Sequence, residues 1–248
     1  MKFFYLELNA FIVAGKKILK IDKSKAFVYT SSWSLVEQFI NLNEDNFGMI
    51  KSNFLMIRDS GIIIDKDDTV KKVLNAFNVS NTFFSANNDY LLEIMNKIII
   101  SNSYNHIDET TKHMISKFKE IRKTANEQNS AVYKEFINNA RNIINTVFDE
   151  ELWCMMVFEL LVNMVKNYSN KPIEQIKRGY NGSLNRYIYA SAQYFGKKHK
   201  TDRNDIIDIE HYKYINNDII HMVSNDKIMT FFDKKKVFSV DQFLEYMK

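Results

Sequence analysis

Short apolar segments alternate with amphipathic segments at both ends of this 248-residue chain, and this alternation constrains the fold more than any other feature. Near the N-terminus, Phe3–Leu6, Ala26–Tyr29 and Gly61–Asp65 have the length and composition of buried strands. Asp218–Val223 and Lys236–Ser239 have the same character near the C-terminus. Strands that alternate with helices predict a parallel sheet flanked by helices. We therefore predict an α/β fold.

The segments between these strands have helical spacing of their apolar residues. The hydroxyl groups of Thr30-Ser-Ser32 can cap a helix that continues to Asn41. Further helices are predicted over residues 10–20, 69–77, 203–215 and 240–247.

The middle of the chain has a different pattern. Residues 86–200 show helical periodicity without strand signals, and residues 150–167 are apolar nearly all round, which predicts a central buried helix. We divide the chain into an α/β domain of residues 1–85 and 203–248, and a helical insertion of residues 86–202. No Gly/Ser linker separates them, so we expect one packed body.

Composition narrows the class of protein. Hydrophobic residues make up 46% and charged residues 26%, which is typical of a globular chain. The single cysteine, Cys154, excludes internal disulfides and Cys-based zinc sites, and it suits a reducing compartment. Glu7 and Asn9 interrupt the apolar N-terminus, which argues against a signal peptide. The apolar run 152–162 is too short to span a bilayer. We expect a cytoplasmic protein without a membrane partner.

Acidic residues recur at comparable places relative to the predicted strands. Glu7 follows the first strand, Glu37 lies in the helix after the second, and Asp226 follows the fourth. Asp205 and Asp208 lie in the helix before that fourth strand. The carboxyl ends of parallel strands meet at one edge of the sheet, and carboxylates gathered there are neutralised most readily by a divalent cation. Oxygen ligands favour Mg²⁺ or Mn²⁺.

Simpler roles stay open for each of these residues. Asp205 can cap a helix, Asp226 can lie in an ordinary turn, and Glu37 can be a solvated side chain. His211, three residues after Asp208, is either a proton-transfer group or an ordinary half-buried histidine.

The order and spacing of these motifs resemble the PIN-domain ribonucleases. Four segments carry the resemblance: YLELNAF (5–11), TSSWSLVE (30–37), VSND (223–226) and VFSVDQFL (237–244). Asp208 precedes Asp226 by eighteen residues, which is similar to the spacing of the family's third and fourth acids. The chain departs from the family at Glu7, where Asp is usual, and in its long insertion. Together these segments span less than half of the chain.

The resemblance implies a metal-dependent endoribonuclease that uses Mg²⁺ or Mn²⁺, with a toxin or defence role by analogy. Its metal ligands would be Glu7, Glu37, Asp208 and Asp226. Spacing favours Asp208 over Asp205 as the third ligand, and Asp205 would be a further catalytic acid, a second ligand there or a helix cap. Asn9, Ser32 and Ser224 would orient ligands or phosphate.

Basic residues are frequent in residues 171–203, just before Asp205, Asp208 and Asp226. Tyrosines 180, 187, 189 and 194 are interleaved with them and can stack on unpaired bases, which favours single-stranded RNA. The other interpretation is a solvated basic face with core tyrosines. The candidate RNA-binding residues are Arg178, Arg186, Lys197, Lys198, Lys200 and Arg203.

Two functions follow from these observations. The first is a PIN-like nuclease acting on RNA. The second is a catalytically silent PIN-like scaffold that binds RNA or a protein. A protein inhibitor and a second copy of the chain are further candidate partners.

Overall fold

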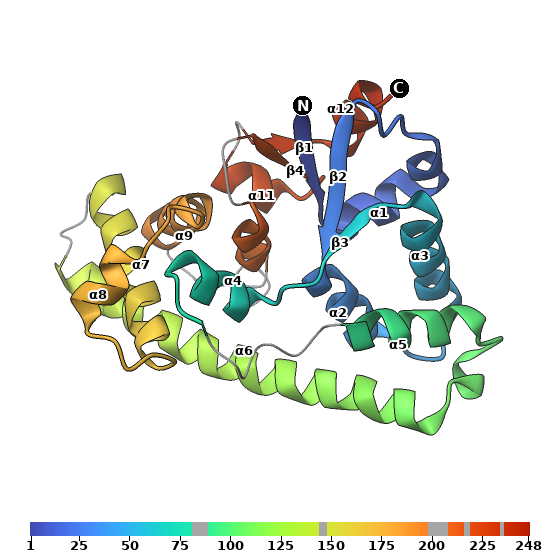
Figure 1. Ribbon diagram of the computed structural model, residues 1–248, viewed down its shortest axis with the longest axis horizontal. Coiled ribbons are helices and arrows are strands. Elements are labelled where there is room, and N and C mark those ends of the chain that lie inside the picture. The colour runs from blue at the N-terminus through green and yellow to red at the C-terminus, as the bar shows by residue number, and fades with distance from the viewer. Residues whose placement is uncertain (81–88, 144–147, 198–207, 216–218, 234–235) are drawn as a thin grey trace.

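The computed structural model describes residues 1–80, 89–143, 148–197, 208–215, 219–233 and 236–248. Within these residues the chain forms a five-stranded sheet, in which neighbouring strands are parallel and the order is β3-β2-β1-β4-β5 (Figure 1). The strands are β1 (Lys2–Leu6), β2 (Ala26–Ser31), β3 (Ile63–Asp65), β4 (Ile220–Val223) and β5 (Val237–Phe238). The α/β prediction and its parallel sheet are confirmed.

Strand β1 lies at the centre of the sheet. It pairs with β2 on one side, where Phe4 is opposite Val28, and with β4 on the other, where Phe4 is opposite His221. Phe4, Tyr5 and Leu6 have no exposed surface. Strands β2 and β4, which are far apart in sequence, therefore both pair with the same buried strand.

Alternation along the strands sends side chains into two hydrophobic layers. Phe3 and Tyr5 face a layer built with α4, α9, α11 and the 3-10 helix η4, whereas Phe4 and Leu6 face a layer built with α1, α2, α3, α5 and α12. The helices of the first layer are α4 (Thr69–Ala76), α9 (Asn185–Lys197), α11 (Lys227–Phe232) and η4 (His211–Tyr214). The helices of the second layer are α1 (Leu8–Ala14), α2 (Ser32–Asn41), α3 (Phe47–Ser60), α5 (Asp89–Ile100) and α12 (Val240–Tyr246).

Local signals set several helix ends. Ser31 caps α2 through the Ser34 amide, and Asp68 caps α4 through the Lys71 amide. Gly15 has φ +51°, and the helix predicted over residues 10–20 divides there into α1 and the 3-10 helix η1 (Gly15–Lys20). Helix α3 was not among the predicted elements.

The middle of the chain is helical in the residues described there, 89–143 and 148–197, which contain no strand. Besides α5 and α9 it forms η3 (Tyr104–His106), α6 (Glu109–Ile143), α7 (Glu150–Lys166) and α8 (Ile173–Arg178). Helix α6 runs below the carboxyl ends of β1 and β2 as drawn in Figure 1. It supplies Ile115 to one hydrophobic layer and Tyr133 to the other.

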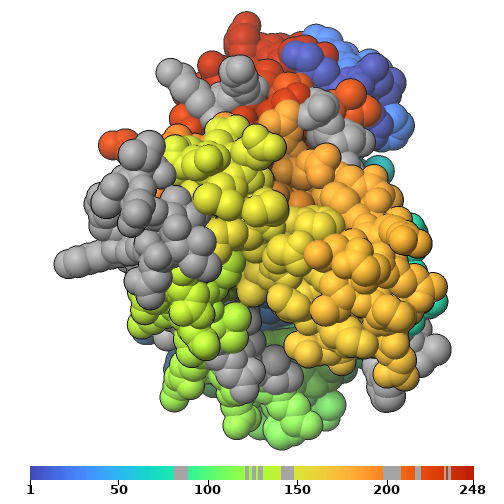
Figure 2. Space-filling view, turned by 90° about the vertical axis from the view of Figure 1, so that its left-hand side faces the viewer, coloured from blue at the N-terminus to red at the C-terminus, as the bar shows by residue number. Residues whose placement is uncertain are grey.

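Helix α7 is not the central buried helix that its composition predicts. Met155 is 55% exposed, and Glu159 forms a surface ion pair with Lys177 at 2.7 Å. One face packs on α8 and α9 through residues such as Trp153 and Leu161. Figure 2 shows α6, α7, α8 and α9 together forming one side of the molecule, in green, yellow and orange. Helix α7 therefore has more apolar residues than buried positions.

In the part of the chain that the structure describes, no helix is long and apolar enough to cross a membrane.

A tight backbone contact joins the helical region to the sheet domain. The Asn181 backbone amide donates to the Ala76 carbonyl at 2.9 Å, and the Asn78 side-chain amide donates to the Gly179 carbonyl at 2.7 Å. A Cβ placed on Gly179 would lie 2.5 Å from the Phe77 carbonyl oxygen. Only glycine fits between these two segments.

We expect Gly179→Ala to lower the free energy of unfolding by about 1–3 kcal/mol, because overpacking forces the backbone segments apart. Denaturant titration measures the change. Gly48→Ala in α3 is the matched control, since nothing lies within 4 Å of its added methyl. It should be neutral or stabilising by up to about 1 kcal/mol. Equal stability of the two variants would contradict the close contact.

Candidate functional site

The carboxyl ends of β1 and β4 lie side by side and bring two acids to the same edge of the sheet. Glu7 directly follows β1 and occupies the N-cap position of α1. Asp226 lies three residues after β4 and caps α11, accepting a 2.9 Å hydrogen bond from the Ile228 amide. The parallel pairing of Leu6 with Val223 places these two turns next to each other. In α/β sheets this edge is where ligand sites form.

Ser224 joins the two turns. Its hydroxyl donates to the Glu7 carboxylate and accepts a 2.9 Å hydrogen bond from the Asp226 amide. Glu7 is only 2% exposed. A buried carboxylate that follows β1 is thus held by a hydroxyl that follows β4, the strand paired with β1.

Glu37 reaches the same edge from helix α2. Its Oε2 atom lies 3.4 Å from His211 Nε2, and His211 is 1% exposed. On the other side of the imidazole ring, Nδ1 lies 2.5 Å from the Tyr5 hydroxyl. Asp208 comes from the helical turn that immediately precedes η4 and is partly buried.

The pKa of Glu7 reflects its burial and the proximity of the other acids. Burial, together with the charges of Glu37 and Asp226, raises the pKa of its carboxyl from the ordinary 4.5 to about 7. His211 and the Ser224 hydroxyl act in the opposite direction. Burial and neighbouring negative charge together outweigh them.

Asp208 behaves in the same way. Burial first, and then the charges of Asp226, Glu7 and Glu37, raise its pKa from 3.8 to about 7, and His211 opposes them. Burial alone would lower the pKa of His211, but the carboxylates, Glu37 first, outweigh burial and raise it. The four predicted acids and one histidine therefore lie within electrostatic reach of one another.

These side chains are near one another without forming a closed coordination shell. Among the described residues, no group of three or more His, Cys, Asp or Glu side chains is arranged to hold a metal ion. The chemistry of the set, carboxylates with one hydroxyl, suits a hard divalent cation. The present side-chain positions do not converge on one point.

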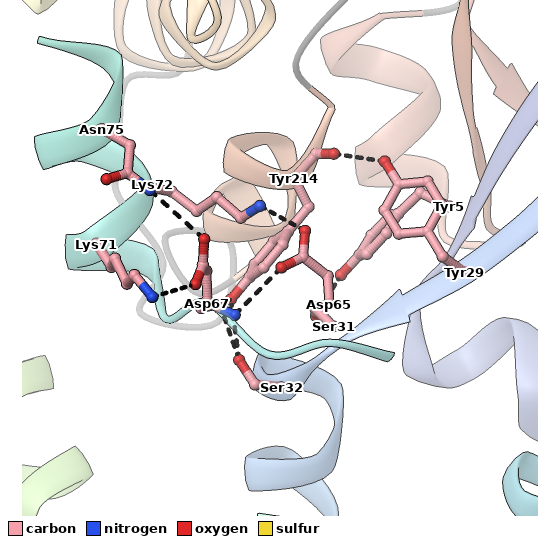
Figure 3. Close-up of polar contacts among 10 residues, drawn as sticks. All are labelled: Tyr5, Tyr29, Ser31, Ser32, Asp65, Asp67, Lys71, Lys72, Asn75 and Tyr214. Atoms are coloured by element: carbon pink, nitrogen blue, oxygen red, sulfur yellow. Dashed lines mark hydrogen bonds and ion pairs between the residues drawn. The ribbon is translucent and has the colours of Figure 1, made fainter. Parts of the chain in front are cut away.

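A second acidic group lies at the end of β3, and here each of two carboxylates has a lysine (Figure 3). Asp65 is paired with Lys72, and Asp67 with Lys71 at 2.6 Å. The Tyr214 hydroxyl donates to the Asp67 carbonyl at 2.9 Å. This neutralised group contrasts with Glu7 after β1 and with Asp208, whose pKa values are raised.

An apolar hollow of about 390 Å³ lies on the sheet face that carries Tyr29. Phe3 and Phe27 stack along it with ring centroids 5.0 Å apart. Phe27 is 47% and Ile63 57% exposed, so this part of the sheet face is uncovered. The lining residues are Phe3, Phe27, Tyr29, Ile63, Asp65, Tyr214 and Ile220.

The basic residues of segment 171–203 make different contacts. Arg186 forms an ion pair with the buried Asp233 at 3.0 Å, which ties α9 to the end of α11. Lys197 lies over the Phe148 ring at 4.7 Å, and Arg178 lies in the last turn of α8. Lys198, Lys200 and Arg203 lie outside the described residues.

The tyrosines in that stretch also divide. Tyr187 and Tyr194 are 1% and 0% exposed, so of the two interpretations the core one holds for them, and they are not available to stack on bases. Tyr180 and Tyr189 keep partial exposure. Sequence spacing could not separate the two pairs, because apolar helix faces also contain tyrosine.

The remaining predicted residues have separate positions. Asn9 is exposed in the first turn of α1, and Ser32 donates to the Asp67 carbonyl at 3.0 Å, at the end of β3. Asp205 lies outside the described residues. Tyr5 was not among the predicted site residues, since its strand position indicates only core packing.

Comparison with known proteins gave no match to any family model, curated protein or solved structure.

We expect Glu7→Gln to stabilise the metal-free protein at pH 8 and to have little effect at pH 4. The folded-state pKa of Glu7, about 7, lies above its ordinary 4.5. The protonated form is therefore favoured by the fold, and this stabilisation is present below pH 4.5 and lost as the pH rises through 7. Glutamine imitates the neutral acid. The gain at pH 8 should be on the order of 1–3 kcal/mol, measured by urea titration in EDTA.

Glu120→Gln, at an exposed position of α6, is the control and should show no such pH dependence. A difference between Glu7→Gln and the unmodified protein that stays constant from pH 4 to 8 would argue against a raised pKa.

Proposed function

We propose that this chain is a metal-dependent, PIN-like nuclease that hydrolyses phosphodiester bonds, with RNA as its substrate. The observation that carries the proposal is the meeting of Glu7, Glu37, Asp208 and Asp226 at the carboxyl edge of a parallel sheet, where Glu37 and Asp226 help to raise the pKa values of both Glu7 and Asp208. Like charges that are buried together are a feature of functional sites rather than of ordinary cores.

The same four carboxylates would hold Mg²⁺ or Mn²⁺. When bound, such a cation activates a water molecule and offsets charge on the phosphate. Ser224 would keep the Glu7 carboxylate in place, and Asp226 would offer its second oxygen, because its Oδ1 atom already caps α11. Small rotations of these side chains toward a common point are part of the proposal.

RNA is the proposed substrate because of the charge and aromatic content of residues 171–203. Of the six candidate RNA-binding residues, the structure describes three, and Arg178 and Lys197 are the two outside the Arg186–Asp233 pair. Tyr180 and Tyr189 are the partly exposed tyrosines that could contact bases.

A catalytically silent PIN-like scaffold is the second candidate function. Two observations favour it: glutamate at position 7 instead of aspartate, and the apolar hollow beside Phe27 and Ile63. Uncovered apolar surface of this kind is typical of protein-binding sites. The two candidates differ in whether the protein binds a divalent cation.

We expect Asp226→Asn to abolish metal-dependent cleavage of labelled single-stranded RNA while the fold stays intact. Asparagine is also a good N-cap, so α11 should keep its first turn, whereas the neutral amide is a poorer ligand for a cation. The loss should exceed the roughly 10–100-fold that follows removal of an outer-shell partner. Cleavage is measured with Mn²⁺ and with EDTA, and unfolding is followed by circular dichroism.

Asp241→Asn is the matched control, because Asp241 also lies at the start of a short helix near the C-terminus, in the first turn of α12. It should leave cleavage unchanged. Full activity of highly purified Asp226→Asn protein would remove Asp226 from the site. Absence of both cleavage and Mn²⁺ binding in the unmodified protein would favour the scaffold.

A further inference from the structure

Tyr5 carries a polar group into the centre of the core. It lies on the central strand β1, two residues before Glu7, and it has no exposed surface. Its hydroxyl lies 2.8 Å from Ser31 Oγ and 2.5 Å from His211 Nδ1. Its ring stacks parallel to that of Tyr214, with an interplanar angle of 1°. Two side-chain partners and a stacked ring therefore fix the position of this hydroxyl.

His211 continues the connection from Tyr5 to Glu37. Its Nδ1 atom faces the Tyr5 hydroxyl, and its Nε2 atom lies 3.4 Å from Glu37 Oε2. Ser31, at the other end, also caps α2, the helix that carries Glu37. A buried chain of four side chains thus runs from β2 through β1 and η4 to α2.

We propose that Tyr5 and His211 are positioning residues that orient the Glu37 carboxylate toward Glu7, Asp208 and Asp226, and so prepare the four acids to bind a divalent cation. This inference rests on the proposed function. A glutamate has several freely rotating bonds, and fixing its rotamer in advance removes an entropic penalty from binding. Outer-shell partners of ligating groups act in this way.

A direct catalytic role does not fit the geometry. Both ring nitrogens of His211 face protein atoms, and His211 and Tyr5 are 1% and 0% exposed. Neither can touch a phosphate without displacing its neighbours. Their influence on the reaction passes through Glu37.

Two substitutions of His211 separate positioning from general structural support. In His211→Gln the amide nitrogen can reach the place of Nε2 and keep a donor for Glu37. In His211→Asn the amide reaches only the place of Nδ1, so that the Tyr5 contact is kept and the Glu37 contact is lost. Tyr5→Phe keeps the ring and removes the hydroxyl that orients the imidazole.

The measurement is Mn²⁺ affinity by titration calorimetry, with thermal unfolding in EDTA to monitor the fold. We expect His211→Asn to weaken affinity by about 10–100-fold and His211→Gln to restore it to within a few-fold. Tyr5→Phe should fall between them. His221→Asn is the control, since His221 lies on β4 against Phe4 and Phe238, and it should bind Mn²⁺ like the unmodified protein.

A double-substitution cycle with Glu37→Gln keeps the test valid if His211→Asn unfolds easily. Once Glu37 has lost its charge, Tyr5→Phe should weaken Mn²⁺ binding no further. At saturating Mn²⁺, kcat for RNA cleavage should recover in Tyr5→Phe, because the defect is in metal affinity.

Unchanged or tighter Mn²⁺ binding in both His211→Asn and Tyr5→Phe would overturn the inference, as would equal losses in His211→Asn and His211→Gln. If Asp226→Asn is inactive while the Tyr5 and His211 variants bind Mn²⁺ normally, only the positioning role fails. If the unmodified protein binds no Mn²⁺, the proposed function fails and the positioning role fails with it.

Discussion

The structure depends on the pairing of β1 with strands on both of its sides. Phe4 lies opposite Val28 of β2 and opposite His221 of β4, so the central strand joins the beginning of the chain to its final part. Both hydrophobic layers use the side chains of this one strand. The same pairing aligns the turns that contain Glu7 and Asp226. Without it there would be neither a closed core nor a meeting of acids.

The site combines burial with unequal compensation of charge. At the end of β3, Asp65 and Asp67 each have a lysine, which makes that group electrically neutral. Around Glu7 and Asp208, burial and neighbouring carboxylates raise the pKa, and His211 supplies the opposing positive charge that the structure describes there. Along the same carboxyl edge of the sheet, the fold therefore retains repulsion near the ends of β1 and β4 and removes it at the end of β3. That contrast distinguishes a candidate site from a polar surface.

The parallel sheet was predictable because its strands are short apolar runs bounded by caps and turns. Asp226 could be placed because residues that follow parallel strands share an edge. Helix α3 was missed, since its burial depends on η1 and α5, which are distant in sequence or irregular. The exposure of α7 and the core positions of Tyr187 and Tyr194 could not be predicted from the sequence either, because they depend on which helix faces pack together. The contacts of His211 with Tyr5 and Glu37 join residues from three separate elements, and no local pattern encodes them.

The order in which the strands leave the ribosome has a consequence for when the site exists. β1 and β2 are synthesised first, but β4 and Asp226 emerge only after the whole helical region, so the central strand lacks one neighbour during most of translation. A growing chain that has not reached Asp226 cannot bring all four acids together. Contacts this distant in sequence also form slowly. For a protein whose proposed substrate is RNA, this delay means that a chain not yet extended to Asp226 holds no complete site while it is still next to its own messenger.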